Sequence, residues 1–326
     1  MAVLRWFFGG NAPERASNAC NLMAMPAGTP TPTQAPFGAV ITAMITPFGS
    51  DGAIDFDQFH RLCRFLTSHG SDGLLVSGTT GESPTLTAAE KLALYAAAVD
   101  AVGGKAPVIA GTGTYDTRAS VEASKAAADH GVDAILAVTP YYSKPSQRML
   151  IAHFNAIADA TELPVIVYNI PGRTSCLVEI PTLVELARHP RIVATKDAVG
   201  DIGFSTRARQ RLPEGFAIYS GDDSMTLPMM AVGGCGVVSV ASHLVGNQIK
   251  AMVSAAAAGD LPEATRLHDQ LMPTFEGCFI EPNPVPLKGA MAALWEPMGA
   301  PRLPLLPALD ATTAALVAAV GKAQSL

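Results

Sequence analysis

The sequence predicts an α/β fold, a (β/α)8 TIM barrel with additional C-terminal helices, on the basis of three observations. From residue 37 onward, short β-branched or apolar runs alternate with amphipathic helical segments, which is the chain order of a parallel sheet. There are eight such runs, spaced roughly 20 to 35 residues apart, and this is the length of one βα unit of a closed barrel. Hydrophobic residues make up 49% of the chain and charged residues 15%, so a large core can form.

Each expected strand is a short apolar run that ends in a turn rich in Gly, Thr or Pro. The eight runs cover residues 39–45, 73–76, 108–110, 134–139, 165–169, 192–197, 217–220 and 236–240. The helices between them carry end signals: Gly70 stops the first one after apolar residues at helical spacing over 56–66. Thr87 and Glu90 form a capping box that opens the second, and Pro181 suits the first turn of a later one.

The chain after the last strand is too long for one closing helix. Its pattern predicts four helices, at 248–258, 262–275, 285–295 and 311–323, the last three of them beyond the barrel. We therefore expect a catalytic TIM barrel at 37–259 and a C-terminal helical extension at 260–326.

Residues 1–36 are expected to be a disordered N-terminal arm, because Pro, Thr and Ala recur at 24–36. Arg5 interrupts the one apolar run that could serve as a secretory signal. An organelle transit peptide remains an alternative, since Glu14 is the only acidic residue of the arm. Met23 and Met25 are alternative start positions.

Charge and composition exclude several classes of partner. The 22 Lys and Arg residues are outnumbered by 28 Asp and Glu, which argues against nucleic acid. Five widely spaced cysteines without a C-x-x-C pair argue against a disulfide framework and indicate a reducing, cytoplasmic location. The seven histidines show no ligand spacing, so no metal is expected. No apolar stretch approaches the roughly 18 to 20 residues of a membrane span.

Lys196 stands out because it alone of the eight lysines lies in an apolar run of the strand type. In a barrel of this kind, side chains at the C-terminal ends of the strands point into the active site. Lowering the pKa of a buried lysine from about 10.4 toward 7 gives a neutral amine that can form a Schiff base with a ketone. The residues leave open an equally weighted alternative, a structural lysine paired with Asp197 or Asp222.

Other strand ends carry hydroxyl and guanidinium groups. Taken singly, Tyr142 and Tyr168 fit core rings, Thr79 fits a turn and Arg173 fits a surface ion pair. Their joint placement favours a site: Thr and Tyr hydroxyls can pass protons, and an Arg can bind a carboxylate with two parallel hydrogen bonds.

Six motifs, in this order along the chain, resemble the dihydrodipicolinate synthase family of the pyruvate-dependent class I aldolase superfamily. They are G-T-T-G-E at 78–82, P-Y-Y at 140–142, Y-N-I-P-G-R-T at 168–174, T-K-D at 195–197, S-G-D-D at 220–223 and E-P-N-P-V-P at 281–286. The resemblance runs from about residue 37 to the C-terminus and implies that Lys196 forms a Schiff base with pyruvate. It also implies condensation with L-aspartate 4-semialdehyde, without an organic cofactor or metal.

The resemblance also implies roles for the other residues. Thr79, Tyr168 and Tyr142 would form a proton relay, with Tyr142 reaching the site of a neighbouring subunit across a tight dimer interface. The pyruvate carboxylate would be held by Thr80 and by the backbone near Val238. Arg173 would bind the carboxylate of the semialdehyde. Members of the family are usually homotetramers, built as dimers of dimers.

Two alternative functions remain. The first is a lyase of the same superfamily that acts on sialic acid or a 2-keto-3-deoxy sugar acid. Such lyases commonly carry Ser in place of Thr79 and lack the N-x-P-x-R-T arrangement that contains Arg173. The second is a noncatalytic homologue that binds a keto acid, which would be marked by loss of Lys196 or of the relay.

The resemblance bears on regulation as well. Lysine-sensitive members bind lysine through two His, an Asn, a Glu and a Tyr; here Tyr141 is retained, but the other positions hold Ala88, Lys91, Tyr115 and Ala119. The acidic partner for the ligand's ammonium is missing and a cation replaces an imidazole, so weak or absent feedback inhibition by lysine is expected. The alternative is a rebuilt site that uses Asp116 or Glu82.

Overall fold

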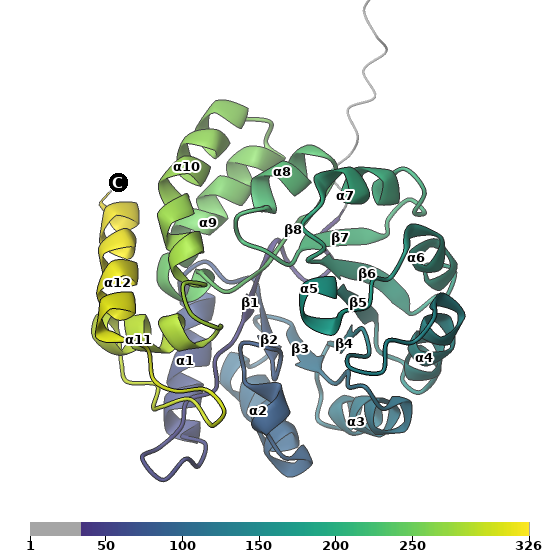
Figure 1. Cartoon of the computed structure of the whole chain (residues 1–326), viewed down its shortest axis with the longest axis horizontal. Coiled ribbons are helices and arrows are strands. Elements are labelled where there is room, and N and C mark those ends of the chain that lie inside the picture. Colours follow the sequence, from purple (N-terminus) through teal and green to yellow (C-terminus); the bar gives the residue numbers. More distant parts are fainter. Residues whose placement is uncertain (1–33, 326) are drawn as a thin grey trace, which may run out of the picture. The chain divides into compact units, whose positions relative to one another are not determined.

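Eight parallel strands close into a barrel, each paired with the next and the first with the last (Figure 1). The structure is a computed structural model and describes residues 34–325. The strands are β1 (Val40–Ala43), β2 (Gly73–Val76), β3 (Val108–Gly111), β4 (Ala134–Val138), β5 (Val165–Asn169), β6 (Ile192–Asp197), β7 (Ala217–Ser220) and β8 (Gly236–Ser239). The predicted (β/α)8 barrel with additional C-terminal helices is confirmed.

The strand predictions at 73–76, 165–169, 192–197 and 217–220 match the structure, and the others differ by one or two residues at one end or, for β1, at both. The end of β8 has a clear cause. The prediction continued the strand to Val240, but the backbone N–H groups of Val240 and Ala241 donate to the Asp223 carboxylate at 2.9 and 3.1 Å. A side chain thus replaces the neighbouring strand as the acceptor there.

Helices surround the barrel (Figure 1). They are α1 (Phe56–Ser68), η1 (Ser83–Thr85, a 3-10 turn), α2 (Ala88–Val102), α3 (Thr117–Asp129), α4 (Gln147–Asp159), α5 (Pro171–Thr174), α6 (Ile180–Leu186), α7 (Ile202–Arg209), α8 (Thr226–Ala231), α9 (Ser242–Ala257), α10 (Leu261–Gly277), α11 (Val285–Leu294) and α12 (Asp310–Gln324). The capping box of Thr87 and Glu90 is confirmed at the start of α2.

The start of α9 was predicted six residues too late. The helix begins at Ser242, with a break in helical geometry at Val245. Gly246 follows the break and passes so close to α1 that a Cβ there would lie 2.2 Å from the His69 carbonyl oxygen. Glycine allows this close approach but has no side chain, so the apolar pattern that predicts a helix is interrupted at this position.

The C-terminal helices pack on the barrel: α9 contacts β1, and α10 and α12 pack against α9 (Figure 1). All described residues belong to one compact unit. The predicted arm, as far as residue 33, lies outside the described residues. Within 34–325, no helix is long and apolar enough to cross a membrane.

Candidate active site

A cavity of about 240 Å³ opens at the C-terminal ends of the strands. Its lining comes from the turn after β2, the ends of β3 to β6 and the short helix α5, and includes Ser77, Gly78, Thr79, Gly113, Tyr141, Tyr168, Arg173 and Lys196. Three basic side chains, Lys91, Arg173 and Lys196, line it, and none of its described lining residues is a carboxylate. A concave site with charges of one sign attracts ligands of the opposite sign, so the cavity suits an anion.

Glycine provides part of the space. A Cβ on Gly113, in the cavity wall after β3, would lie 2.3 Å from the backbone nitrogen of Val138. Such a contact would push β3 and β4 apart, so the G-T-G turn is required by the close approach of two strands as well as by the cavity.

Lys196 lies on β6 between Tyr168 of β5 and Tyr219 of β7, which are its register partners. Its side chain is buried, and Nζ lies 4.2 Å from the centre of the Tyr168 ring. Burial lowers the pKa of Lys196 to about 7; the carboxylate of Asp223 opposes this shift and the charge of Arg173 adds to it. A substantial fraction of Lys196 is therefore a neutral amine near neutral pH.

The structural alternative for Lys196 is wrong, because Lys196 forms no ion pair among residues 34–325. Asp197 follows it in the strand and so faces the opposite side of the sheet, where Ser205 Oγ donates to it at 2.7 Å. Asp222 is engaged within its own turn, where it accepts hydrogen bonds from the Ser224 backbone and hydroxyl. Neither carboxylate neutralises the lysine.

Tyr168 has a protonated hydroxyl near neutral pH. Burial raises the pKa of Tyr168 to about 12, while the charge of Arg173 and a hydrogen bond with the Thr79 side chain act in the opposite direction. The structure thus brings together three of the predicted relay and Schiff-base residues, Thr79, Tyr168 and Lys196, around one cavity.

Arg173 lies at the mouth of the cavity in α5, directly after β5. Its guanidinium is exposed and has no ion-pair partner among the described residues. Asn169 fixes the loop that follows Arg173. Its Nδ2 donates to the Val178 carbonyl and its Oδ1 accepts from the Val178 N–H, both at 3.0 Å. The backbone near Arg173 is therefore held in place, and its guanidinium has no ion-pair partner within residues 34–325.

The other three predicted site residues do not line this cavity. Tyr142 is 93% exposed, and its φ of 70° lies in a region that bulky residues rarely adopt. Thr80 directly follows the lining residue Thr79 in the turn after β2, and its buried hydroxyl accepts a hydrogen bond from Asn283 Nδ2 at 2.9 Å. Val238 is buried in the barrel interior on β8.

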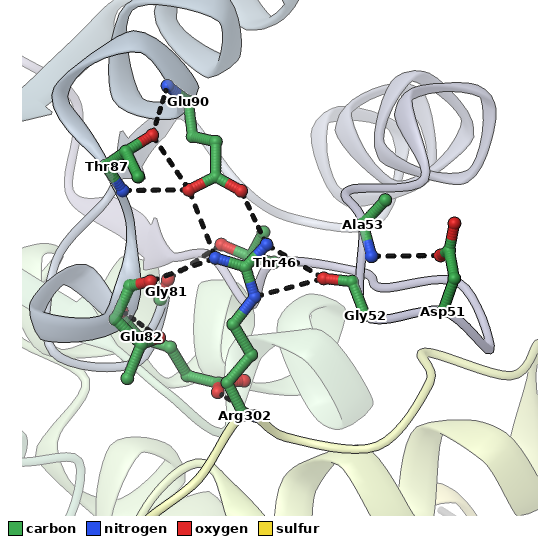
Figure 2. Close-up of polar contacts among 10 residues, drawn as sticks. Thr46, Asp51, Gly52, Ala53, Gly81, Glu82, Thr87, Glu90 and Arg302 are labelled. Carbon is green, nitrogen blue, oxygen red and sulfur yellow. Dashed lines mark hydrogen bonds and ion pairs between the residues drawn. The ribbon is translucent and has the colours of Figure 1, made fainter.

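A polar network that the sequence pattern did not predict holds the turn after β2. Figure 2 shows Arg302 reaching Gly52, the start of α2 and Glu82 from a segment far along the chain. Glu82 is also paired with Lys288 at 2.7 Å, and both side chains are buried. The available signal was the single charge of Lys288 in the otherwise apolar residues 285–294.

Asp223 was also missed, although it lies in one of the six motifs. It is fully buried and accepts three hydrogen bonds, two from backbone N–H groups and one from the hydroxyl of Ser239. It thereby holds the turns after β7 and β8 against each other beside Lys196. Within residues 34–325, no cluster of three His, Cys, Asp or Glu could hold a metal ion.

Comparison with known proteins agrees with this geometry. The profile of the Dihydrodipicolinate synthetase family matches residues 36–323. The 4-hydroxy-tetrahydrodipicolinate synthase of Desulforudis audaxviator is 51% identical over 274 residues, which cover 84% of this chain and 93% of the relative. The synthase of Synechococcus elongatus is 52% identical over 278 residues, which cover 85% and 93%.

Solved structures are similar as well. The dihydrodipicolinate synthase DapA-2 of Bacillus anthracis is 45% identical, with a TM-score of 0.85 over 87% of this chain and 98% of that one. The enzyme of Cyanidioschyzon merolae with lysine bound is 43% identical, with a TM-score of 0.87 over 89% and 99%. By the match of the profile and by these relatives, the chain belongs to the dihydrodipicolinate synthetase family.

Proposed function

We propose that the chain is a lyase that condenses pyruvate with L-aspartate 4-semialdehyde to 4-hydroxy-tetrahydrodipicolinate, through a Schiff base at Lys196. The observation that carries the proposal is a buried lysine that has no ion-pair partner among the described residues and a pKa lowered to about 7, in a cavity that Lys91 and Arg173 also line. Relatives about half identical to this chain carry the same named activity.

The chemistry follows from a neutral amine. Lys196 Nζ attacks the ketone carbon of pyruvate, and loss of water from the carbinolamine gives an iminium ion. The iminium accepts the electron pair left when a methyl proton departs, which gives an enamine. The enamine carbon attacks the aldehyde carbon, and attack of the semialdehyde's own amine on the former ketone carbon expels Lys196.

Three hydroxyls are proposed to move the protons. Tyr168 is protonated and next to Lys196, and Thr79 bonds to it, so the two can deliver a proton to the carbinolamine oxygen and take up another. Tyr142 would complete this relay in a second copy of the chain, a role that fits its exposure and its rare backbone conformation. We further propose the homotetramer, built as a dimer of dimers, that the family resemblance implies, and sedimentation velocity on the full chain tests it.

Two carboxylates need separate partners. For pyruvate we propose the hydroxyl of Thr80 and the backbone near Val238, since both lie close to the turns at the same end of the barrel. For the semialdehyde we propose Arg173, whose guanidinium is free to form two parallel hydrogen bonds.

The choice of aldehyde tests the proposal against the sugar acid lyases. With pyruvate held constant, L-aspartate 4-semialdehyde is expected to be consumed, whereas N-acetylmannosamine and glyceraldehyde are not. Thr79 and the placement of Arg173 support this choice. Preferential consumption of a sugar aldehyde would assign the chain to the lyases, and no consumption of any aldehyde would support a noncatalytic keto acid binder.

Replacing Arg173 with alanine is expected to raise the KM for the semialdehyde by roughly 10- to 150-fold, the value of a charge-assisted hydrogen bond of about 1.5 to 3 kcal/mol. The KM for pyruvate should change little, because pyruvate is bound deeper in the cavity. Steady-state kinetics with each substrate varied in turn measure both. An unchanged KM for the semialdehyde would give Arg173 a structural role.

L-Lysine is expected to inhibit weakly or not at all. Lys91 and Tyr141 line the same cavity, where the charge of Lys91 would repel the ligand's ammonium. The carboxylates that could rebuild a site are engaged: Glu82 pairs with Lys288, and Asp116 caps α3. Activity is titrated against L-lysine at subsaturating pyruvate, and half-inhibition below about 1 mM, a binding free energy of about 4 kcal/mol, would contradict the expectation.

A further inference from the structure

Two buried links join the turn after β2 to residues 283–288. Asn283 Nδ2 donates to Thr80 Oγ1 at 2.9 Å, and Lys288 Nζ lies 2.7 Å from Glu82 Oε1. All four residues are buried, with exposed fractions of 7% for Asn283, 2% for Thr80 and 3% each for Lys288 and Glu82. Since the two links join the same two segments, the Asn283 amide is held in a fixed place relative to the Thr80 hydroxyl.

Arg302 adds a third link to the same turn. Its backbone N–H donates to Glu82 Oε2 at 2.8 Å, and its guanidinium donates to the Thr85 carbonyl at 2.9 Å and to Glu90 (Figure 2). From the other side, the hydroxyl of Thr46 donates to the Gly81 carbonyl at 2.7 Å. The turn is therefore fixed on both sides of Thr80, and a change in the Asn283 side chain leaves these bonds in place.

The hydrogen-bonding capacity of the Asn283–Thr80 pair is only partly used. Thr80 Oγ1 has no other partner among the described residues, so its own hydrogen remains available. Asn283 Oδ1 is buried without a partner. The pair therefore keeps one donor, the Thr80 hydroxyl hydrogen, and one acceptor, Asn283 Oδ1, without a hydrogen-bond partner among residues 34–325.

We propose that Asn283 is a positioning residue that, by donating to Thr80 Oγ1, directs the Thr80 hydroxyl hydrogen toward the carboxylate of the bound keto acid. A hydroxyl that accepts from the amide on one side can donate on the other. The inference rests on the proposed function, because it takes pyruvate as the ligand and Thr80 as a partner of its carboxylate. Asn283 is not among the residues that line the cavity, so it would act through Thr80.

The test measures pyruvate capture alone. Borohydride traps the Schiff base, and the pyruvate concentration that gives half-maximal trapping is compared among variants. Asn283→Ala is expected to raise this concentration about tenfold, the value of one hydrogen bond, while the KM for the semialdehyde stays the same. Gln324→Ala is the matched control, since Gln324 is another C-terminal amide and its Nε2 donates to the Leu244 carbonyl at 2.8 Å, away from the turn.

A double variant separates positioning from general loosening of the site. If Asn283 acts through Thr80, Asn283→Ala should add little in a Thr80→Val background, whereas independent effects would multiply to about a hundredfold. Asn283→Asp keeps the side-chain shape but as a carboxylate can only accept, so it should impair capture at least as strongly as Asn283→Ala.

The outcomes are distinct. Wild-type half-saturation in Asn283→Ala or Asn283→Asp, or multiplied effects in the double variant, would overturn the positioning role. An Asn283→Ala protein that does not fold leaves the decision to Asn283→Asp. Failure of the wild-type chain to be labelled by pyruvate would instead overturn the proposed function, so the two failures are distinguishable.

Discussion

Replacement of Lys196 by alanine is expected to abolish covalent capture of pyruvate and to lower turnover by roughly 10⁴- to 10⁶-fold, the loss that follows removal of a covalent nucleophile. Borohydride added with pyruvate should attach a reduced pyruvyl group to the wild-type peptide that contains Lys196. Mass spectrometry of the digested protein measures this. We expect the label at Lys196 because, among the described lysines, only Lys196 is both buried on a barrel strand and lowered in pKa to about 7.

Lys91 provides the control for this experiment. It lines the same cavity, and burial also lowers its pKa, so Lys91→Ala should remain labelled at Lys196. Labelling that survives Lys196→Ala would contradict the assignment. The pKa of about 7 also predicts that capture in the wild type weakens about tenfold for each pH unit below 7, because only the neutral amine attacks.

Replacement of Tyr168 by phenylalanine is expected to lower kcat by roughly 10²-fold or more, the usual loss of an acid–base group. The ring is retained, so its packing in the barrel and its contact with Lys196 should be retained as well. Borohydride labelling by pyruvate should still reach Lys196, although more slowly. Steady-state kinetics, thermal melting and labelling of the same preparation measure the three properties.

Tyr219 is the matched control for Tyr168. It lies on the strand at the other side of Lys196 and is also buried, but its hydroxyl accepts a hydrogen bond from the Phe37 N–H at 3.1 Å. Tyr219→Phe is therefore expected to cost some stability but to leave kcat within a few-fold of the wild type. A Tyr168→Phe enzyme with wild-type kcat would remove Tyr168 from the relay.

The barrel was predictable because its signals are local. A buried parallel strand reads as a short apolar run ended by a turn, and this pattern placed β2, β5, β6 and β7 at their observed bounds. The same pattern singled out Lys196, since a lysine within such a run must be buried. The predicted end of β8 at Val240 was wrong, because the Val240 N–H donates to Asp223, which is distant in sequence.

The sequence by itself thus determined the barrel, the strand that carries Lys196 and the set of residues that could act with it. Only the tertiary structure decided the surroundings of these residues. The sequence allowed Asp197 as an ion-pair partner of Lys196, but successive side chains of a strand point to opposite faces, and Asp197 accepts from Ser205 on the other face. Asn283 and Thr80 are 203 positions apart, and no local pattern indicates that they bond. Strand and helix patterns depend on neighbours in sequence, whereas the pKa of a lysine and the direction of a hydroxyl depend on groups that only the closed barrel brings together.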